Sequence, residues 1–343
     1  MRGSTGPRFQ RGSRWTEARN MRRVYLNLRG GLRRKHNESM RLLPFLPLLL
    51  PVFGCAQTQA PVSTSGLPSI APGRYERTIM SGGLSRKFIL HVPKAYDGSK
   101  PVPMVVVLHG WGGSGASMEG YSGMADEAEK RGYVSVFPDG LGKTPGWNAG
   151  FIDLSFQKKD DIGFVGELMT EVEKQVGIDS KRIYVCGHSN GAFLTNAVGA
   201  KYGDKLAAIG AVAGTIGLPK AAGVNNIPTP PSKLSVIAIH GRLDPVVGYG
   251  GTGAVQAMLQ GVGALDAATW WAEKLGAIDP KTTDADGVET KIWRNLEGYD
   301  VELVSLATAK HDWPGSLSRS TTPDSKRAEK ILMDFFDAHV KKG

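Results

Sequence analysis

The chain has 343 residues, of which 41% are hydrophobic and 22% charged, and it carries a formal net charge of +10 with a pI near 9.5. These proportions are typical of globular proteins and exclude a chain that is disordered throughout or crosses a membrane many times. Two cysteines are too few for a disulfide framework. A basic pI raises nucleic acid or an anionic membrane as a partner, so the location of the charge decides its meaning.

The excess positive charge lies in residues 1–39, a basic upstream segment with eleven basic and two acidic residues. No apolar period runs through it, so we expect no packed element there. From Cys55 onward the chain has 30 basic and 30 acidic residues. The remainder is therefore neutral, and the charge gives no support for nucleic-acid binding.

A secretory signal is predicted over residues 40–54. Met40-Arg41 precedes a twelve-residue apolar run, Leu42 to Phe53, which has the length of a signal h-region and is too short for the ~20 residues that span a bilayer. Two interpretations of residues 1–39 stay open. The segment is either a mis-assigned start, with translation beginning at Met40, or a long n-region; we favour the start at Met40.

The sequence Val52-Phe53-Gly54-Cys55 resembles a bacterial lipobox, which implies lipidation of Cys55; ordinary cleavage nearby is the alternative. Residues 55–72 are rich in Gln, Thr, Ser, Pro and Ala, a composition typical of a flexible tether. We therefore expect an exported bacterial protein, either extracellular or a lipoprotein of the outer membrane or periplasm, that touches a membrane only through its lipid.

One α/β domain is predicted over residues 73–343. Short β-rich segments alternate with helical ones, and apolar runs such as Met104–Leu108 are typical of strands covered on both faces. The predicted strands are Arg74–Met80, Lys87–Val92, Met104–Leu108, Tyr133–Phe137, Arg182–Cys186, Ala207–Val212, Leu234–Ile239 and Val301–Leu306. The predicted helices are Met118–Arg131, Ile162–Val176, Ala192–Tyr202, Ala264–Leu275 and Asp324–Val340. With a hairpin at its start, this pattern predicts a mostly parallel, doubly wound, eight-stranded sheet with helices on both faces.

A G-x-S-x-G motif follows the strand that ends at Cys186. Gly187-His188-Ser189-Asn190-Gly191 leads directly into a helix, which is the context of the nucleophile elbow of α/β hydrolases. The alternative is a chance match in a chain with 45 glycines. The motif predicts an α/β-hydrolase fold with Ser189 as the nucleophile.

A serine nucleophile requires a base and a carboxylate that orients it. Asp244 and His311 each follow a late predicted strand, and Ser, Asp, His is the chain order of this fold. We therefore expect His311 as the base and Asp244 as the acid, with Asp266 and Asp312 as rivals for Asp244. The other histidines of the domain, given structural roles, are His91, His109, His188, His240 and His339.

The oxyanion donors are expected to be the backbone N–H groups of Trp111, in the loop His109–Gly113, and of Asn190. Gly110, Gly112 and Gly115 also have the G-x-G-x-x-G spacing of a dinucleotide site. The export signal and the triad favour the oxyanion loop. Since no P-loop lysine follows and the histidines lack metal-ligand spacing, we expect no cofactor and no metal.

Six motifs together resemble the esterase family of polyhydroxybutyrate depolymerases, which also holds feruloyl and acetylxylan esterases and related secreted lipoproteins. The motifs, in order between about Arg74 and Val340, are Val107–Gly113, Phe137–Gly140, Gly146–Asn148, Asp161–Phe164, Gly187–Ala192 and His311–Gly315. The resemblance implies the triad Ser189, Asp244 and His311. It also implies that Trp147 and Trp313 lie near the acyl or alcohol site.

Two features depart from this family. Many relatives carry additional cysteines, whereas Cys186 is alone in this domain and is interpreted as a buried structural residue. Because the predicted catalytic domain takes up residues 73–343, we expect no appended polymer-binding module in this sequence. Several aromatic side chains are candidates for a substrate pocket, with burial in the core as the alternative; they are Trp111, Trp147, Phe151, Trp313 and Tyr249, the last in a glycine-rich loop.

The sequence thus predicts an exported serine carboxylic-ester hydrolase that forms an acyl-enzyme and acts on hydroxycinnamoyl (feruloyl), acetyl or hydroxyalkanoate esters. Its partner would be a small-molecule or a plant or polymer ester, as in polysaccharide degradation. The alternatives are a serine peptidase on the same fold and a non-catalytic surface lipoprotein that binds glycans. The sequence makes no prediction of the oligomeric state.

Overall fold

The computed structural model describes residues 66–150, 159–217, 229–254, 262–316 and 322–342. The predicted upstream segment, the signal, Cys55, most of the tether and Phe151 lie outside these residues. The last tether residues contact the domain, since the Tyr96 hydroxyl donates to the Pro68 carbonyl at 2.8 Å. No helix in the described ranges is long and apolar enough to cross a membrane.

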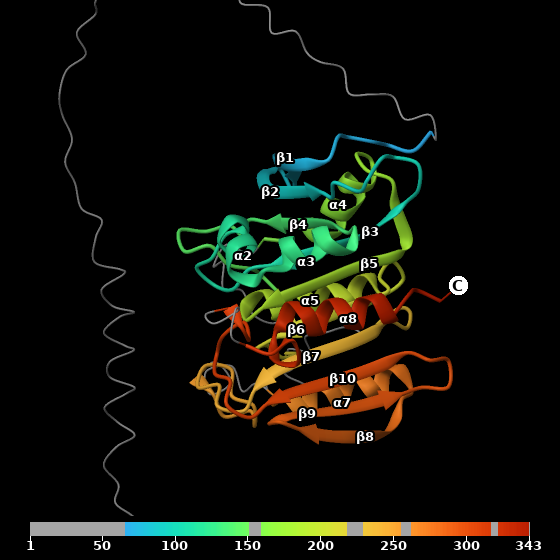
Figure 1. The fold of residues 1–343 in the computed structure, drawn as a ribbon. Coiled ribbons are helices and arrows are strands. Elements are labelled where there is room, and N and C mark those ends of the chain that lie inside the picture. The colour runs from blue at the N-terminus through green and yellow to red at the C-terminus, as the bar shows by residue number, and fades with distance from the viewer. Residues whose placement is uncertain (1–65, 151–158, 218–228, 255–261, 317–321, 343) are drawn as a thin grey trace, which may run out of the picture. The chain divides into compact units, whose positions relative to one another are not determined.

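Ten described strands form one mixed sheet in the order β1-β2-β4-β3-β5-β6-β7-β10-β9-β8. Figure 1 shows β1 at one end of this sheet and β8 at the other. Within this order the five neighbouring pairs of the run β4-β3-β5-β6-β7-β10 are parallel. The antiparallel hairpins β1–β2 and β8–β9 flank this run, one on each side. The strands are Gly73–Ser81 (β1), Leu84–Val92 (β2), Val102–Leu108 (β3), Val134–Pro138 (β4), Ile178–His188 (β5), Ala208–Val212 (β6), Ser235–Gly241 (β7), Ile278–Ala285 (β8), Val288–Arg294 (β9) and Asp300–Leu306 (β10).

All eight predicted strands are present, which confirms the α/β architecture, but the predicted strand count was too low. The structure adds the hairpin β8–β9, whose two-residue turn is Asp286-Gly287 with positive φ values of 53° and 76°. β8 lies at the sheet edge and its described side chains from Asp279 to Ala285 are exposed, so it has no apolar pattern to detect. The Asp-Gly pair between alternating residues was the available signal.

Helices cover both faces of the sheet, as predicted (Figure 1). α4 (Asp161–Glu173), α5 (Asn190–Tyr202) and α7 (Ala264–Leu275) pack on one face, and α2 (Gly115–Ser122), α3 (Met124–Arg131) and α8 (Ala328–Ala338) on the other. A 3-10 turn, η2 (Asp324–Lys326), precedes α8. The predicted helix Met118–Arg131 is two helices, because Gly123 takes a left-handed φ of 72° between them.

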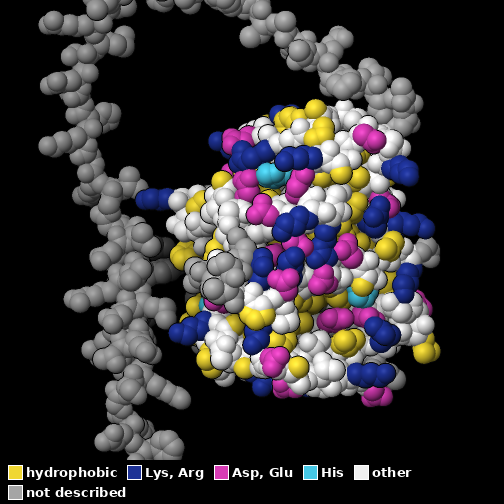
Figure 2. All heavy atoms as spheres, viewed as in Figure 1, with side chains coloured by type: hydrophobic (Ala, Val, Ile, Leu, Met, Phe, Trp, Pro, Cys, Tyr) yellow, Lys and Arg dark blue, Asp and Glu magenta, His cyan; other side chains and the backbone are white. Residues whose placement is uncertain are grey.

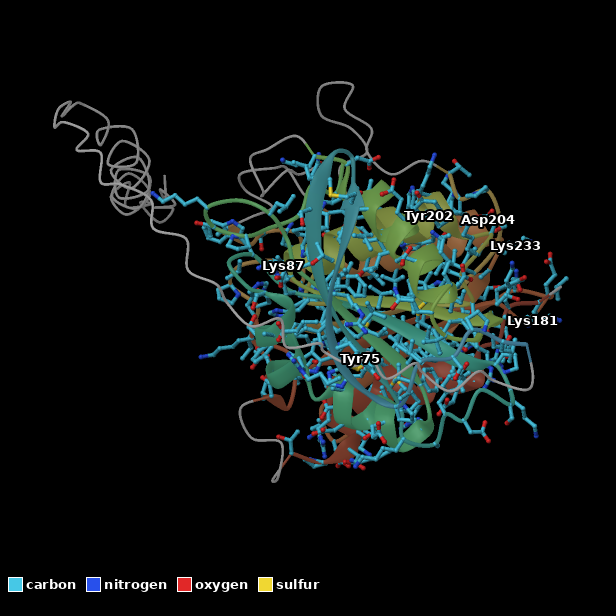
Figure 3. All side chains as sticks on the ribbon, turned by 90° about the horizontal axis from the view of Figure 1, so that it is seen from above. Tyr75, Lys87, Lys181, Tyr202, Asp204 and Lys233 are labelled. Carbon is cyan, nitrogen blue, oxygen red and sulfur yellow. The ribbon has the colours of Figure 1, made fainter. Side chains whose placement is uncertain are left out.

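The parallel strands all end on the same side of the sheet, and the loops that follow their carboxyl ends carry Ser189, Asp244 and His311. Figure 3 labels three residues near the amino ends of these strands, on the side away from the triad: Lys181, Asp204 and Lys233. The side chains on the α8 face mix both signs of charge (Figure 2). Glu127 of α3, for example, pairs with Arg131 and with Lys330 of α8, both at 3.0 Å.

Candidate active site

Ser189 occupies the turn between β5 and α5. Its backbone has φ 53° and ψ −115°, a conformation that costs a non-glycine residue roughly 1–3 kcal/mol and is found mainly at functional sites. The Ser189 N–H donates to the Val212 carbonyl at 2.9 Å. Gly191 allows the closest approach, since a Cβ there would collide with the carbonyl oxygens of Leu108 and His109. The turn therefore holds Ser189 against the loop that follows β3.

The structure brings Ser189, His311 and Asp244 together. His311 Nε2 lies 2.8 Å from Ser189 Oγ, and His311 Nδ1 lies 2.8 Å from Asp244 Oδ2. Because a carboxylate can only accept, the proton belongs on Nδ1, which leaves Nε2 to accept from the serine hydroxyl. This is the tautomer that a general base next to a serine nucleophile needs.

Asp244 is held from two sides. Its Oδ1 accepts the N–H groups of Val246 at 2.8 Å and Val247 at 2.9 Å, so only Oδ2 faces His311. Burial raises the pKa of the Asp244 carboxyl, but hydrogen bonds from His240 and His311 outweigh it and hold the pKa well below its usual value. Asp244 is therefore ionised at every pH at which His311 is neutral and can act as a base.

His240 and His188 border this triad, and the sequence did not reveal their positions. His240 Nε2 lies 2.6 Å from the Val247 carbonyl oxygen and 3.5 Å from Asp244 Oδ2. The His188 ring packs at 5.3 Å from the His311 ring. Burial, followed by repulsion from His311, lowers the pKa of His188 to about 3, so this imidazole is neutral.

Among the described residues, neither rival acid forms a hydrogen bond or ion pair with His311. Asp266 accepts the N–H of Gly263 at 3.3 Å and thus caps α7. Asp312 has a buried Oδ1 without a hydrogen-bond partner among the described atoms, and burial, followed by the charge of Asp244, raises the pKa of its carboxyl. Of the rival histidines, His91 pairs with Glu119 and His339 with Asp300.

The loop after β3 passes directly beside the nucleophile, since a Cβ on Gly110 would lie 3.4 Å from Ser189 Cβ. No protein acceptor is found for the backbone N–H of Trp111 or of Asn190 in the described part of the chain. Gly115 at the start of α2 donates instead to Asp139 at 2.6 Å. This N-terminus is thus already occupied by a carboxylate, which disfavours the dinucleotide alternative.

The aromatic residues divide by exposure. Trp147 and Trp313 have no exposed surface, which agrees with the alternative of burial in the core; their place near the acyl or alcohol site stays a prediction. The Tyr249 hydroxyl is 2.8 Å from Ser305 Oγ, and its ring is partly exposed. Trp111 is 54% exposed, and it follows Gly110 in the loop that passes beside Ser189. No cluster of three or more potential metal ligands occurs within the described ranges.

Comparison with known proteins places this geometry in a family. Residues 95–269 match the family model described as phospholipase/carboxylesterase. Feruloyl esterase B of Piromyces equi is 27% identical over 220 residues, covering 62% of this chain and 40% of that protein. Feruloyl esterase C of Emericella nidulans is 26% identical over 187 residues, covering 52% and 63%. The chain thus spans less than two thirds of the length of either relative.

Among solved structures, an acetyl xylan esterase from Aspergillus awamori has the same fold, with a TM-score of 0.58 at 18% identity over 77% of this chain and 99% of that one. The predicted α/β-hydrolase fold and the resemblance to an esterase family are confirmed. The chain belongs to the phospholipase/carboxylesterase family of α/β hydrolases.

Proposed function

We propose that this protein is a serine carboxylic-ester hydrolase that works through an acyl-enzyme at Ser189. The observation that carries the proposal is the continuous chain of hydrogen-bonding atoms from Ser189 Oγ through His311 to the buried Asp244, with 2.8 Å at each step. The backbone N–H groups of Trp111 and Asn190, for which the described residues offer no acceptor, lie in the loop after β3 and at the start of α5, on either side of the serine.

In the proposed reaction Ser189 Oγ attacks the ester carbonyl carbon while His311 Nε2 takes the hydroxyl proton. The carbonyl oxygen becomes an oxyanion and accepts from the N–H groups of Trp111 and Asn190. When the C–O bond to the alcohol breaks, His311 returns its proton to the leaving oxygen. Water then attacks the acyl-serine by the same route and releases the carboxylic acid, while Asp244 stabilises each transient imidazolium.

The proposed substrates are hydroxycinnamoyl, acetyl or hydroxyalkanoate esters, free or attached to a plant polysaccharide or polymer. Family membership and the relatives named feruloyl esterase support the carboxylic ester. The exposed Trp111 ring, carried by the loop that passes beside Ser189, supports an aromatic acyl group. We further propose export, with a lipid anchor at Cys55, on the apolar run and the lipobox-like sequence before that residue.

Initial rates on four esters test this proposal. The protein is assayed with p-nitrophenyl acetate, methyl ferulate, acetylated xylan and hydroxybutyrate oligomers, next to Ser189→Ala. We expect turnover of at least one ester by the wild type and none above background by the variant. Hydrolysis of an amide faster than of its matched ester would favour a peptidase, and absence of any turnover with retained glycan binding would favour the non-catalytic alternative.

A further inference from the structure

The segment between β4 and α4 carries the end of one sequence motif, Phe137–Gly140, and the whole of another, Gly146–Asn148, for which the triad gives no reason. We call residues 139–149 the bracket loop. It contains Gly140 and the Gly146–Asn148 motif, and an antiparallel bridge joins Leu141 to Gly146 within it. The indole of Trp147 points into the core and has no exposed surface. Its buried polar contacts therefore define what the loop does.

The bracket loop holds the oxyanion loop at three points. The Trp147 indole N–H donates to the His109 carbonyl at 2.7 Å. The Gly140 N–H donates to His109 Nε2 at 2.8 Å, which leaves the His109 Nδ1–H to donate to the Gly110 carbonyl at 2.7 Å. Gly112 donates its N–H to the Pro145 carbonyl, also at 2.7 Å. These bonds flank Trp111 on both sides and fix the direction of its amide.

Trp147 also holds the nucleophile elbow, the turn that carries Ser189. The Trp147 backbone N–H donates to Asn190 Oδ1 at 2.7 Å, and Asn190 Nδ2 donates back to the Trp147 carbonyl at 3.2 Å. Asn190 is fully buried, and its backbone N–H is the second proposed oxyanion donor. Trp147 thus bonds with its side chain to one donor-bearing element and with its backbone to the other.

A buried ion pair fixes the far end of the bracket loop. The next residue, Asn148, donates its N–H to Asp161 Oδ2 at 2.8 Å. Asp161 Oδ1 pairs with Arg86 Nη2 at 2.6 Å, and both side chains are almost completely buried. The Arg86 guanidinium lies 3.7 Å from the Phe164 ring centroid. The bracket loop is thereby anchored to β2 and α4. Neither of these elements carries one of the two proposed oxyanion donors.

We infer that Trp147 is a positioning residue that sets the distance between the two oxyanion donors. The inference rests on the proposed function. A glycine-rich loop has little intrinsic preference for one amide direction, so the His109–Gly113 loop depends on external bonds for it. Because an oxyanion forms only after attack, loosening these bonds weakens the transition state and leaves binding of the ester largely unchanged.

Trp147→Phe tests the inference, because it keeps a buried ring and deletes the indole N–H. Its matched control is Trp271→Phe, since Trp271 is 1% exposed and donates its indole N–H to Asn196 at 2.8 Å, away from the oxyanion loop. We expect Trp147→Phe to lower kcat for p-nitrophenyl acetate by about 10–100-fold with KM within about threefold. Affinity for a trifluoromethyl ketone, whose adduct with Ser189 carries an oxyanion, should fall in parallel.

Trp271→Phe should keep kcat within about threefold of the wild type, although both variants lose thermal stability. Asn190→Ala removes the two bonds to Trp147 while keeping its own backbone N–H, and it decides the question by the same criteria if Trp147→Phe does not fold. Equal kcat in the two Trp variants, or a loss confined to KM, would overturn the inference. A wild type without esterase activity would overturn the proposed function itself, and this inference with it.

Discussion

Replacing Asp244 by Asn changes one atom, and the surrounding bonds decide which way the new amide faces. Val246 and Val247 both donate backbone N–H groups to Oδ1. The amide oxygen must take this place, since an NH₂ group there would face two donors. The NH₂ group then points at His311 Nδ1, which has to accept, and the imidazole proton moves to Nε2.

With a proton on Nε2, His311 can no longer accept from Ser189. In serine proteases, the Asp→Asn change that enforces this wrong tautomer lowers kcat by about 10⁴-fold. At 1.36 kcal/mol per tenfold change, this corresponds to roughly 5 kcal/mol of transition-state stabilisation. We expect a similar loss in Asp244→Asn because its geometry enforces the same tautomer.

The assay is kcat for p-nitrophenyl acetate at pH 7, with a thermal melt to show that the variant is folded. Asp312→Asn is the matched control, since Asp312 follows His311 directly and makes no hydrogen bond to its ring. We expect the control to stay within about threefold of the wild type. If Asp244→Asn kept more than a tenth of the wild-type kcat, the assignment of Asp244 as the orienting carboxylate would be refuted.

Three further predictions concern residues around the triad. Gly191→Ala should lower kcat by about 100-fold, because its Cβ collides with the oxyanion loop, whereas Gly120→Ala, with no atom within 4 Å of the new Cβ, should keep activity and gain about 0.5–1 kcal/mol in urea unfolding. Burial lowers the pKa of His109 to about 4 from 6.5. Because the unfolded chain takes up the proton first, the free energy of unfolding should fall by up to roughly 3 kcal/mol between pH 6.5 and pH 4. His109→Gln should therefore flatten the dependence of urea-unfolding stability on pH in that range. An unchanged profile would contradict the burial argument. Trp313→Phe should cost about 1–3 kcal/mol of stability and leave KM for methyl ferulate within about twofold, because Trp313 is fully buried. A raised KM at unchanged stability would support the predicted place of Trp313 near the acyl or alcohol site instead.

The buried parallel strands were predictable because continuous apolar runs such as Met104–Leu108 leave no other placement. The hairpin β8–β9 was missed because its edge strand is polar, so only the Asp286-Gly287 turn marked it. The break at Gly123 was missed because both halves of the predicted helix keep a helical composition, and only the left-handed φ of this residue separates them.

The candidate site follows the same division. The order of Ser189, Asp244 and His311 along the chain predicted residues that the structure brings within hydrogen-bond distance. The motif around Trp147 indicated importance, but a motif does not say whether an indole faces a substrate or the core. That distinction depends on which partner accepts its N–H, here the His109 carbonyl. It is a fact of tertiary packing that no local pattern contains.

The central claim is that Ser189 is the nucleophile of an ester hydrolase, and covalent labelling tests it most directly. The wild type and Ser189→Ala are incubated with a fluorophosphonate, and the modified residue is located by peptide mass spectrometry, in parallel with hydrolysis of p-nitrophenyl acetate. We predict one label per chain, on Ser189, with loss of hydrolysis in proportion to labelling. An active wild type that is labelled at another residue, or a Ser189→Ala variant that still hydrolyses the ester, would contradict this account.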